Sequence, residues 1–161
     1  MLYNLLQLET IVKLTELTGR KFFIVPFYGI SQDPDTKNYI LVFKYIDSNF
    51  QNFYLTRDFS PQVILTKVVC IYYICLSLGI IHSYNLIHRD FHVDNILQNG
   101  LNTYISDFGL CRPANESDDK KIYGVMPYVA PEVLCNEPYT QKSDIYSLGI
   151  IINAIISGNL P

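Results

Sequence analysis

The stretch LIHRDFHVDNILQNGLNTYISDFG, residues 86–109, decides the fold. Its apolar residues come in short pairs, Leu86-Ile87, Ile96-Leu97 and Tyr104-Ile105, and polar or charged residues separate the pairs. Asn99-Gly100, between the last two pairs, is a turn dipeptide. This pattern predicts short strands joined by loops, which is where functional side chains concentrate.

Four short motifs occur in order in this stretch and after it. They are His88-Arg89-Asp90 with Asn95 five residues after the aspartate, Asp107-Phe108-Gly109, Ala130-Pro131-Glu132, and Asp144-Ile145-Tyr146-Ser147-Leu148-Gly149. Each motif alone is a weak signal, because such strings arise by chance. All four in this order leave coincidence very little room.

Together the motifs resemble the signatures of protein kinases of the serine/threonine or tyrosine-kinase-like group. The resemblance runs over nearly the whole chain and implies an α+β, two-lobed fold, expected to be truncated at both ends. Residues 1–46 would be a remnant of the small lobe and hinge, with one helix and a β-hairpin, and residues 47–161 an incomplete, mainly helical large lobe. The implied activity is transfer of the ATP γ-phosphoryl group to protein hydroxyls, chiefly serine or threonine, with Mg²⁺ as cofactor.

Patterns before the decisive stretch predict the small-lobe elements. Leucines and valine near helical spacing predict a helix over residues 2–17. Phe22–Val25 and Tyr39–Phe43 are rich in β-branched and aromatic residues, and Asp33-Pro34-Asp35 supplies turn chemistry between them. The two segments are therefore expected to form an antiparallel hairpin.

Two apolar helices are expected in the rest of the chain. Ser60-Pro61 predicts the start of one that ends near Ser83, and its core is apolar enough to span a bilayer. The kinase resemblance makes it a buried core helix instead. Ser143 is expected to cap a second helix over Ile145–Ile156, apolar on nearly all faces and ending at Gly158. The polar residues 111–123 predict an exposed loop.

Phosphoryl transfer requires groups that hold the acceptor hydroxyl, the phosphates and the metal in line. The resemblance makes Asp90 the carboxylate that orients the hydroxyl and accepts its proton. It makes Asn95 and Asp107 the oxygen ligands of Mg²⁺, a hard cation. Arg89 and His92 belong to the same predicted catalytic set, and His88 and Asp144 are expected to hold the loop.

On the nucleotide side the resemblance implies a hinge that contacts adenine, after Phe43 as gatekeeper. The residues expected to bind the nucleotide, besides Asp107, are Lys44, Tyr45, Ile46 and Leu97.

The sequence departs from the family pattern at several points. It has no Gly-rich phosphate loop and no strand lysine before the first helix, and the glutamate that would pair with that lysine is Glu9 or is replaced by Leu5. His92 and Val125 stand where serine/threonine kinases usually carry lysine and threonine, which leaves serine/threonine against tyrosine specificity open. A catalytically inactive pseudokinase, an interaction module and a gene fragment therefore stay open as alternatives. Glu132 is expected to need an arginine further along the large lobe.

Arg89 directly before Asp90 resembles kinases that are switched on by a phosphate in the activation segment. Ser117 and Tyr123 are the candidate acceptors, for an upstream kinase or for autophosphorylation. The alternative is an ion pair between Arg89 and an acidic neighbour, Asp118 or Asp119.

Composition narrows the partners. A net charge of −3 and a pI near 5.5 argue against nucleic acid and against an anionic membrane surface, so a protein substrate is the expected partner. Four cysteines without metal-ligand spacing, and no secretory signal, predict reduced thiols in the cytoplasm. A metal-hydrolase cluster of His88, Asp90 and His92 would need further ligands, and His82 is the one other histidine.

Overall fold

The computed structural model describes residues 12, 24–47, 50, 55–100, 102–115 and 121–161. Val12 is helical, but the rest of the helix predicted over residues 2–17, with Leu5 and Glu9, lies outside the described residues. Ser117, Asp118 and Asp119 lie outside them as well.

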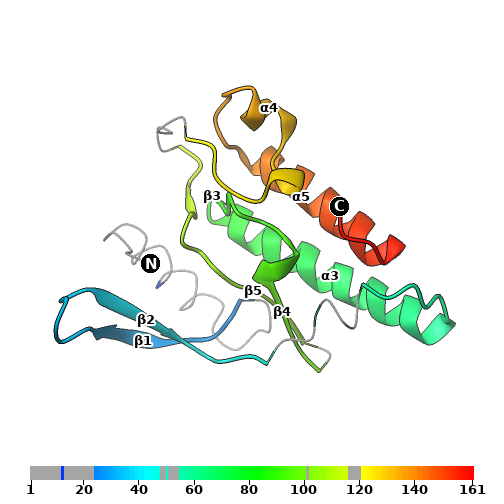
Figure 1. Ribbon diagram of the computed structural model, residues 1–161, viewed down its shortest axis with the longest axis horizontal. Helices are drawn as coiled ribbons and strands as arrows, with labels where there is room; N and C mark the ends of the chain where they lie inside the picture. Colours follow the sequence, from blue (N-terminus) through cyan, green and yellow to red (C-terminus); the bar gives the residue numbers. More distant parts are fainter. Residues whose placement is uncertain (1–11, 13–23, 48–49, 51–54, 101, 116–120) are drawn as a thin grey trace.

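An antiparallel hairpin forms from β1 (Phe27–Gln32) and β2 (Tyr39–Phe43). Its turn is closed by the Asp33 carboxylate, which accepts hydrogen bonds from the amides of Asp35 (3.0 Å) and Thr36 (2.7 Å). The second strand and the turn confirm the sequence pattern. Figure 1 shows the hairpin extending away from the long helices.

The first strand begins later than predicted. Ile24 makes one isolated parallel bridge to Ile105, and the Val25 amide donates to the Ile105 carbonyl (3.1 Å). Pro26 has no amide hydrogen to continue a ladder, and its carbonyl accepts from the Lys44 amide instead (2.7 Å). The chain therefore pairs first with a strand from far along the sequence, and the hairpin starts at Phe27.

The long helix α3 (Pro61–Ser83) begins after Ser60 and ends where the sequence indicated, although the Ser60 side chain makes no capping hydrogen bond. It packs against α5 and β5, and Ile74 and Ile81 on its inner face are fully buried. By length and composition α3 could cross a membrane, but a third of its most apolar window is already buried in the protein. Core helices of soluble proteins meet the same criteria, so this is weak evidence for a membrane.

The last helix, α5 (Gln141–Ser157), is capped by Thr140 rather than by Ser143. The Thr140 hydroxyl accepts from the Lys142 amide (3.2 Å), and the Ser143 hydroxyl returns the bond by accepting from the Thr140 amide (3.0 Å). Ser143 thus takes the role that Glu or Gln plays in a capping box, one turn inside the helix. Gly158 ends the helix in the left-handed conformation, as predicted (φ 73°).

The burial of α5 is one-sided. Ile151 and Ile155 are fully buried against α3 and the central core, whereas Ile145 and Ile156 are 52% and 55% exposed. The sequence of this helix is apolar on nearly all faces, and the described residues cover one of them. Figure 1 shows α3 and α5 lying side by side.

Residues 86–109 and the residues that follow them up to α5 form short strands and single turns. β3 (Leu86–Ile87) pairs with β6 (Arg112–Pro113), and β4 (Ile96–Asn99) pairs antiparallel with β5 (Asn102–Ile105). The single turns are η1 (Val93–Asn95), η2 (Met126–Tyr128) and the short helix α4 (Pro131–Leu134). All three predicted apolar pairs are strands.

The loop predicted over residues 111–123 is exposed only in part: Ala114, Asn115, Lys121 and Ile122 are exposed, and residues 116–120 lie outside the described residues. Cys111 is buried in the main core, and Arg112–Pro113 forms the strand that pairs with β3. The pairing draws this part of the chain inward because Leu86 and Ile87 need a partner for their backbone groups in a buried place.

Candidate active site

One buried carboxylate on α5, that of Asp144, holds the loop that follows β3. Asp144 Oδ2 accepts from the His88 amide (2.8 Å), and Oδ1 accepts from the Arg89 amide (3.0 Å). His82 Nε2, at the end of α3, lies 2.8 Å from Oδ2. Asp144 is 2% exposed, so these three partners replace the water that its charge has lost. Arg89 itself sits at a positive φ of 70°, which turns the chain toward Asp90.

His88 belongs to the core rather than to the surface of the loop. Its ring lies 5.4 Å from the rings of both Phe91 and Phe108, and Nε2 is 3.2 Å from the Ser106 carbonyl oxygen. Burial lowers the pKa of His88 below its ordinary value, so the ring is neutral. The histidine thereby links the catalytic loop to the Asp107-Phe108-Gly109 segment.

Asp90 is a partly exposed carboxylate at the centre of the loop. His92 Nε2 lies 3.5 Å from its Oδ1, and contact with this imidazole lowers the pKa of Asp90 and raises that of His92. The carboxylate is therefore ionised at neutral pH. Gly124 lies beside it at φ 96°, a conformation that favours glycine, and a Cβ added there would be in ordinary contact, 3.5 Å from Oδ1.

Asn95 and Asp107 flank the same end of the β4–β5 pair, one just before β4 and the other two residues after β5. Ile96 is opposite Ile105 in the register, and the Ser106 amide and hydroxyl both donate to the Asn95 carbonyl oxygen (2.9 and 3.0 Å). Asp107 follows at φ 56° and is exposed, with Oδ1 accepting from the Gly109 amide (3.1 Å).

This pair fits the Mg²⁺ that the sequence predicts. The Asn95 amide nitrogen donates to the Asp90 carbonyl oxygen (2.8 Å), which leaves the amide oxygen as an acceptor. Mg²⁺ takes one or two side-chain oxygens and keeps several waters or phosphate oxygens, so one amide oxygen and one carboxylate suffice.

The predicted nucleotide residues lie along the end of β2 and on β4. Ile46 is buried in the main core, and Leu97 is a partly buried member of the same cluster, as is Phe43. Tyr45 is 85% exposed, so its side chain adds no packing surface there. Lys44 is tied to the chain before β1 through its backbone amide.

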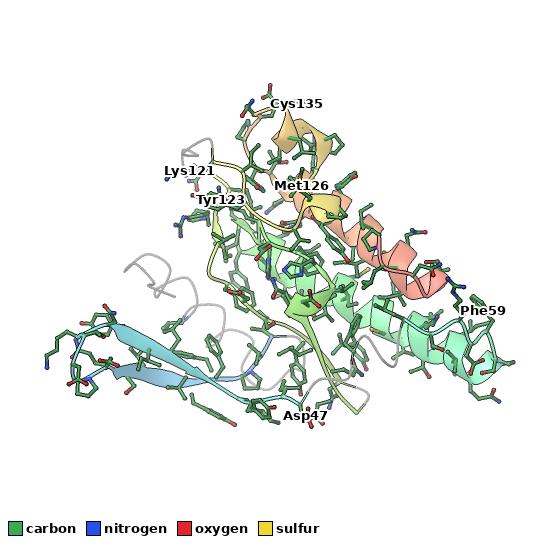
Figure 2. All side chains as sticks on the ribbon, in the orientation of Figure 1. Asp47, Phe59, Lys121, Tyr123, Met126 and Cys135 are labelled. Carbon is green, nitrogen blue, oxygen red and sulfur yellow. The ribbon has the colours of Figure 1, made fainter. Side chains whose placement is uncertain are left out.

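Arg89 lies between two tyrosines. Its guanidinium carbon is 5.1 Å from the ring centroid of Tyr123 and 4.6 Å from that of Tyr139. The Tyr139 hydroxyl accepts from the Tyr123 amide (2.7 Å) and donates to the Tyr123 carbonyl oxygen (2.6 Å). We call these three residues the aromatic clamp. Figure 2 shows Tyr123 on the segment that leads to Met126 and η2.

The clamp was not predicted. The sequence offered a phosphate or an acidic neighbour as the partner of Arg89; Tyr123 was predicted only as a candidate phosphate acceptor, and Tyr139 had no predicted role. The acidic neighbours are outside the described residues, so that alternative stays a prediction. No local pattern marks Tyr139, because it contacts Arg89 from the residues just before α5.

His82 and Tyr128 were also missed. His82 was considered only as a metal ligand, but it binds Asp144. Tyr128 is buried with its ring 5.9 Å from that of His92, its carbonyl accepts from the Ser147 hydroxyl (2.7 Å), and burial raises the pKa of its phenol.

Two further expectations can be compared with the geometry. Among the described residues, no group of three His, Cys, Asp or Glu side chains could hold a metal ion, which removes the support for a hydrolase cluster around His88 and His92. Glu132 is exposed in the structure, and no arginine follows it in the sequence, so the expected pairing stays a prediction.

Comparison with known proteins gives one consistent family. The protein kinase domain model matches residues 8–161. Serine/threonine-protein kinase SBK1 of Danio rerio is 29% identical over 150 residues, which cover 86% of this chain and 37% of that protein. Serine/threonine-protein kinase CST20 of Candida albicans is 41% identical over 88 residues, 53% of this chain and 7% of the relative.

The fold has a solved counterpart. The kinase PK-1 of the Cydia pomonella granulovirus superposes with a TM-score of 0.76 over 99% of this chain and 59% of the viral chain, at 19% identity. That likeness concerns the fold. The chain spans between 7% and 37% of the length of the two curated relatives.

Proposed function

The chain belongs to the protein kinase family, and from that premise we propose that it carries the phosphoryl-transfer site of an active serine/threonine kinase. The observation that carries the proposal is Asp90, a partly exposed, ionised carboxylate whose backbone carbonyl accepts a hydrogen bond from Asn95, the proposed metal ligand. The relatives named as serine/threonine kinases support the choice of acceptor.

In the proposed reaction an acceptor hydroxyl enters beside Gly124 and donates a hydrogen bond to Asp90. Asp90 holds the oxygen in line with the γ-phosphorus of ATP and takes the hydroxyl proton as the new phosphate ester bond forms and the bond to ADP breaks. Asn95 and Asp107 would hold Mg²⁺, which when bound neutralises the charge on the phosphates. His88 and Asp144 keep the loop in place through the contacts described above.

The test uses the complete domain of the parent protein, with phosphate transfer from ATP to a generic protein acceptor as the readout. Asp90→Asn keeps the shape and removes the base, and we expect a loss of about 10²- to 10⁴-fold in kcat. Asp47→Asn makes the same chemical change at an exposed site after β2 and should leave the rate unchanged. Full activity of the Asp90 variant would refute the assignment.

A second candidate is a non-catalytic kinase-like module. It is favoured by the sequence, which has no Gly-rich phosphate loop and no strand lysine in these 161 residues. Thermal unfolding with Mg²⁺-ATP separates the two, since ligand at 100 times its Kd stabilises a protein by about 2.7 kcal/mol. A shift that Asp107→Ala abolishes supports the catalytic proposal; no shift in the complete domain supports the module.

Regulation and location complete the proposal. Arg89 suggests control by phosphate on Ser117 or Tyr123, added by an upstream kinase or by the protein itself. All four cysteines are free, which suits a reducing cytoplasm. Mass spectrometry of the protein before and after incubation with ATP would identify the phosphorylated residue.

A further inference from the structure

His92 occupies the position, two residues after Asp90, where the motif usually carries lysine. The side chain is buried in the loop, with 9% of the residue exposed. Its Nε2 lies 3.1 Å from the amide nitrogen of Asn95 and 3.5 Å from Asp90 Oδ1, and its Nδ1 lies 3.7 Å from Asp94 Oδ2. The imidazole therefore touches a proposed metal ligand directly.

Of the two neighbours of Nε2, Asn95 is the closer. A separation of 3.1 Å is within the ordinary range for a nitrogen hydrogen bond, and 3.5 Å is beyond it. An amide nitrogen can only donate, so in the neutral imidazole Nε2 offers its lone pair and the ring proton lies on Nδ1, on the side of the Asp94 carboxylate. Protonation of the ring, which the neighbouring Asp90 favours, would place a hydrogen on Nε2 and break this bond.

Both hydrogens of the Asn95 amide are then in use. One is donated to the Asp90 carbonyl oxygen (2.8 Å) and the other to His92 Nε2. A half-turn of the amide would lose both bonds and place its oxygen against two acceptors. The oxygen is thus fixed on the opposite side, free for the cation.

We propose that His92 is a positioning residue that orients the Asn95 amide toward Mg²⁺ by accepting a hydrogen bond. The inference rests on the proposed function. A lysine cannot do this, because its ammonium has three donors and no acceptor. The histidine is therefore not a substitute for the usual lysine but has a different role at the same position.

The contact with Tyr128 adds to the orientation. The Tyr128 ring is 5.9 Å from the imidazole and is itself buried, so it adds packing that holds the imidazole in place. Hydrogen bonds to a residue behind a metal ligand commonly change metal affinity 10- to 100-fold.

The experiment compares His92→Gln, His92→Lys and His92→Ala in the complete domain of the parent protein. Mn²⁺ serves as the probe, and its free concentration is followed by electron paramagnetic resonance in the presence of ADP. Glutamine can present an acceptor near the position of Nε2, so His92→Gln should stay within about threefold of the wild-type Mn²⁺ Kd. The lysine and alanine variants should weaken binding at least tenfold.

Asp107→Ala and Asp90→Asn are the reference variants. Wild-type Mn²⁺ affinity in His92→Lys, together with a loss in Asp107→Ala, would overturn the positioning role and leave the proposed function intact. Undiminished Mn²⁺ binding by Asp107→Ala would overturn the metal site, and with it the proposed function. Asp90→Asn should lose phosphoryl transfer but keep Mn²⁺ affinity. Far-UV circular dichroism melts check that each variant is folded.

Discussion

Replacing Asp144 with asparagine should destabilise the protein strongly for a change of one atom. The carboxylate accepts from His82, His88 and Arg89 while 2% exposed, so solvent does not screen these bonds. Asparagine keeps one oxygen, which is best placed at Oδ2, where it serves two donors. Its amide group then faces the Arg89 amide, donor against donor.

The expected loss in the free energy of unfolding follows from the hydrogen bonds that Asp144 accepts. A bond to a charged group contributes about 1.5–3 kcal/mol, and the two that remain are weakened because their acceptor becomes neutral. We expect Asp144→Asn to lower the free energy of unfolding by about 3 kcal/mol and Asp144→Ala by about 3–5 kcal/mol.

The assay is urea unfolding at pH 7 and 25 °C, followed by far-UV circular dichroism and analysed for midpoint and slope. Asp47→Asn, the same replacement at an exposed position, is the control and should change stability by less than about 0.5 kcal/mol. If Asp144→Asn were as stable as that control, the three hydrogen bonds would not hold the loop as described.

Two further predictions concern the activation segment and the core. Tyr139→Phe keeps the ring over Arg89 but removes both hydrogen bonds to the Tyr123 backbone, so we expect a loss of about 1–3 kcal/mol in urea unfolding and faster proteolytic cleavage around residues 121–125; unchanged cleavage would contradict the clamp. Burial raises the pKa of the Cys111 thiol from 9.0 to about 12, so between these values the folded thiol keeps a proton that the unfolded one releases. Stability should therefore fall as pH rises, by about 1 kcal/mol between pH 9 and 10 and toward about 1.4 kcal/mol per unit above that, and Cys111→Ala should remove this part of the fall when unfolding is measured at pH 8, 9 and 10.

Elements with a strong local pattern could be predicted from the sequence. α3 combines a proline at its first position with twenty-three residues in one helix, and β2 is a run of β-branched and aromatic residues, so both were located with their ends. The cap of α5 was placed three residues late because Thr140 and Ser143 are both cap formers. Their reciprocal bonds decide the order.

Features that depend on distant partners could not be predicted. Ile24 and Val25 have the composition of a hairpin strand, yet they pair with Ile105, which no local pattern indicates. The motif residues of the site were predicted by resemblance, and the structure brings Asp90, His92 and Asn95 into contact. Tyr139 stands fifty residues after Arg89, so only the folded chain reveals the contact between them.

The aromatic clamp also determines how this region responds to its surroundings. Ion pairs between exposed groups weaken as ionic strength rises, because mobile ions screen exposed charges, with a Debye length of about 10 Å at 0.1 M salt. The part of the clamp that joins Tyr139 to Tyr123 consists of two hydrogen bonds between a neutral hydroxyl and the Tyr123 backbone. Salt has little charge to screen in these two bonds. The attachment of Tyr123 to Tyr139 should therefore persist in concentrated electrolyte, whereas denaturant, which solvates backbone groups, would release it.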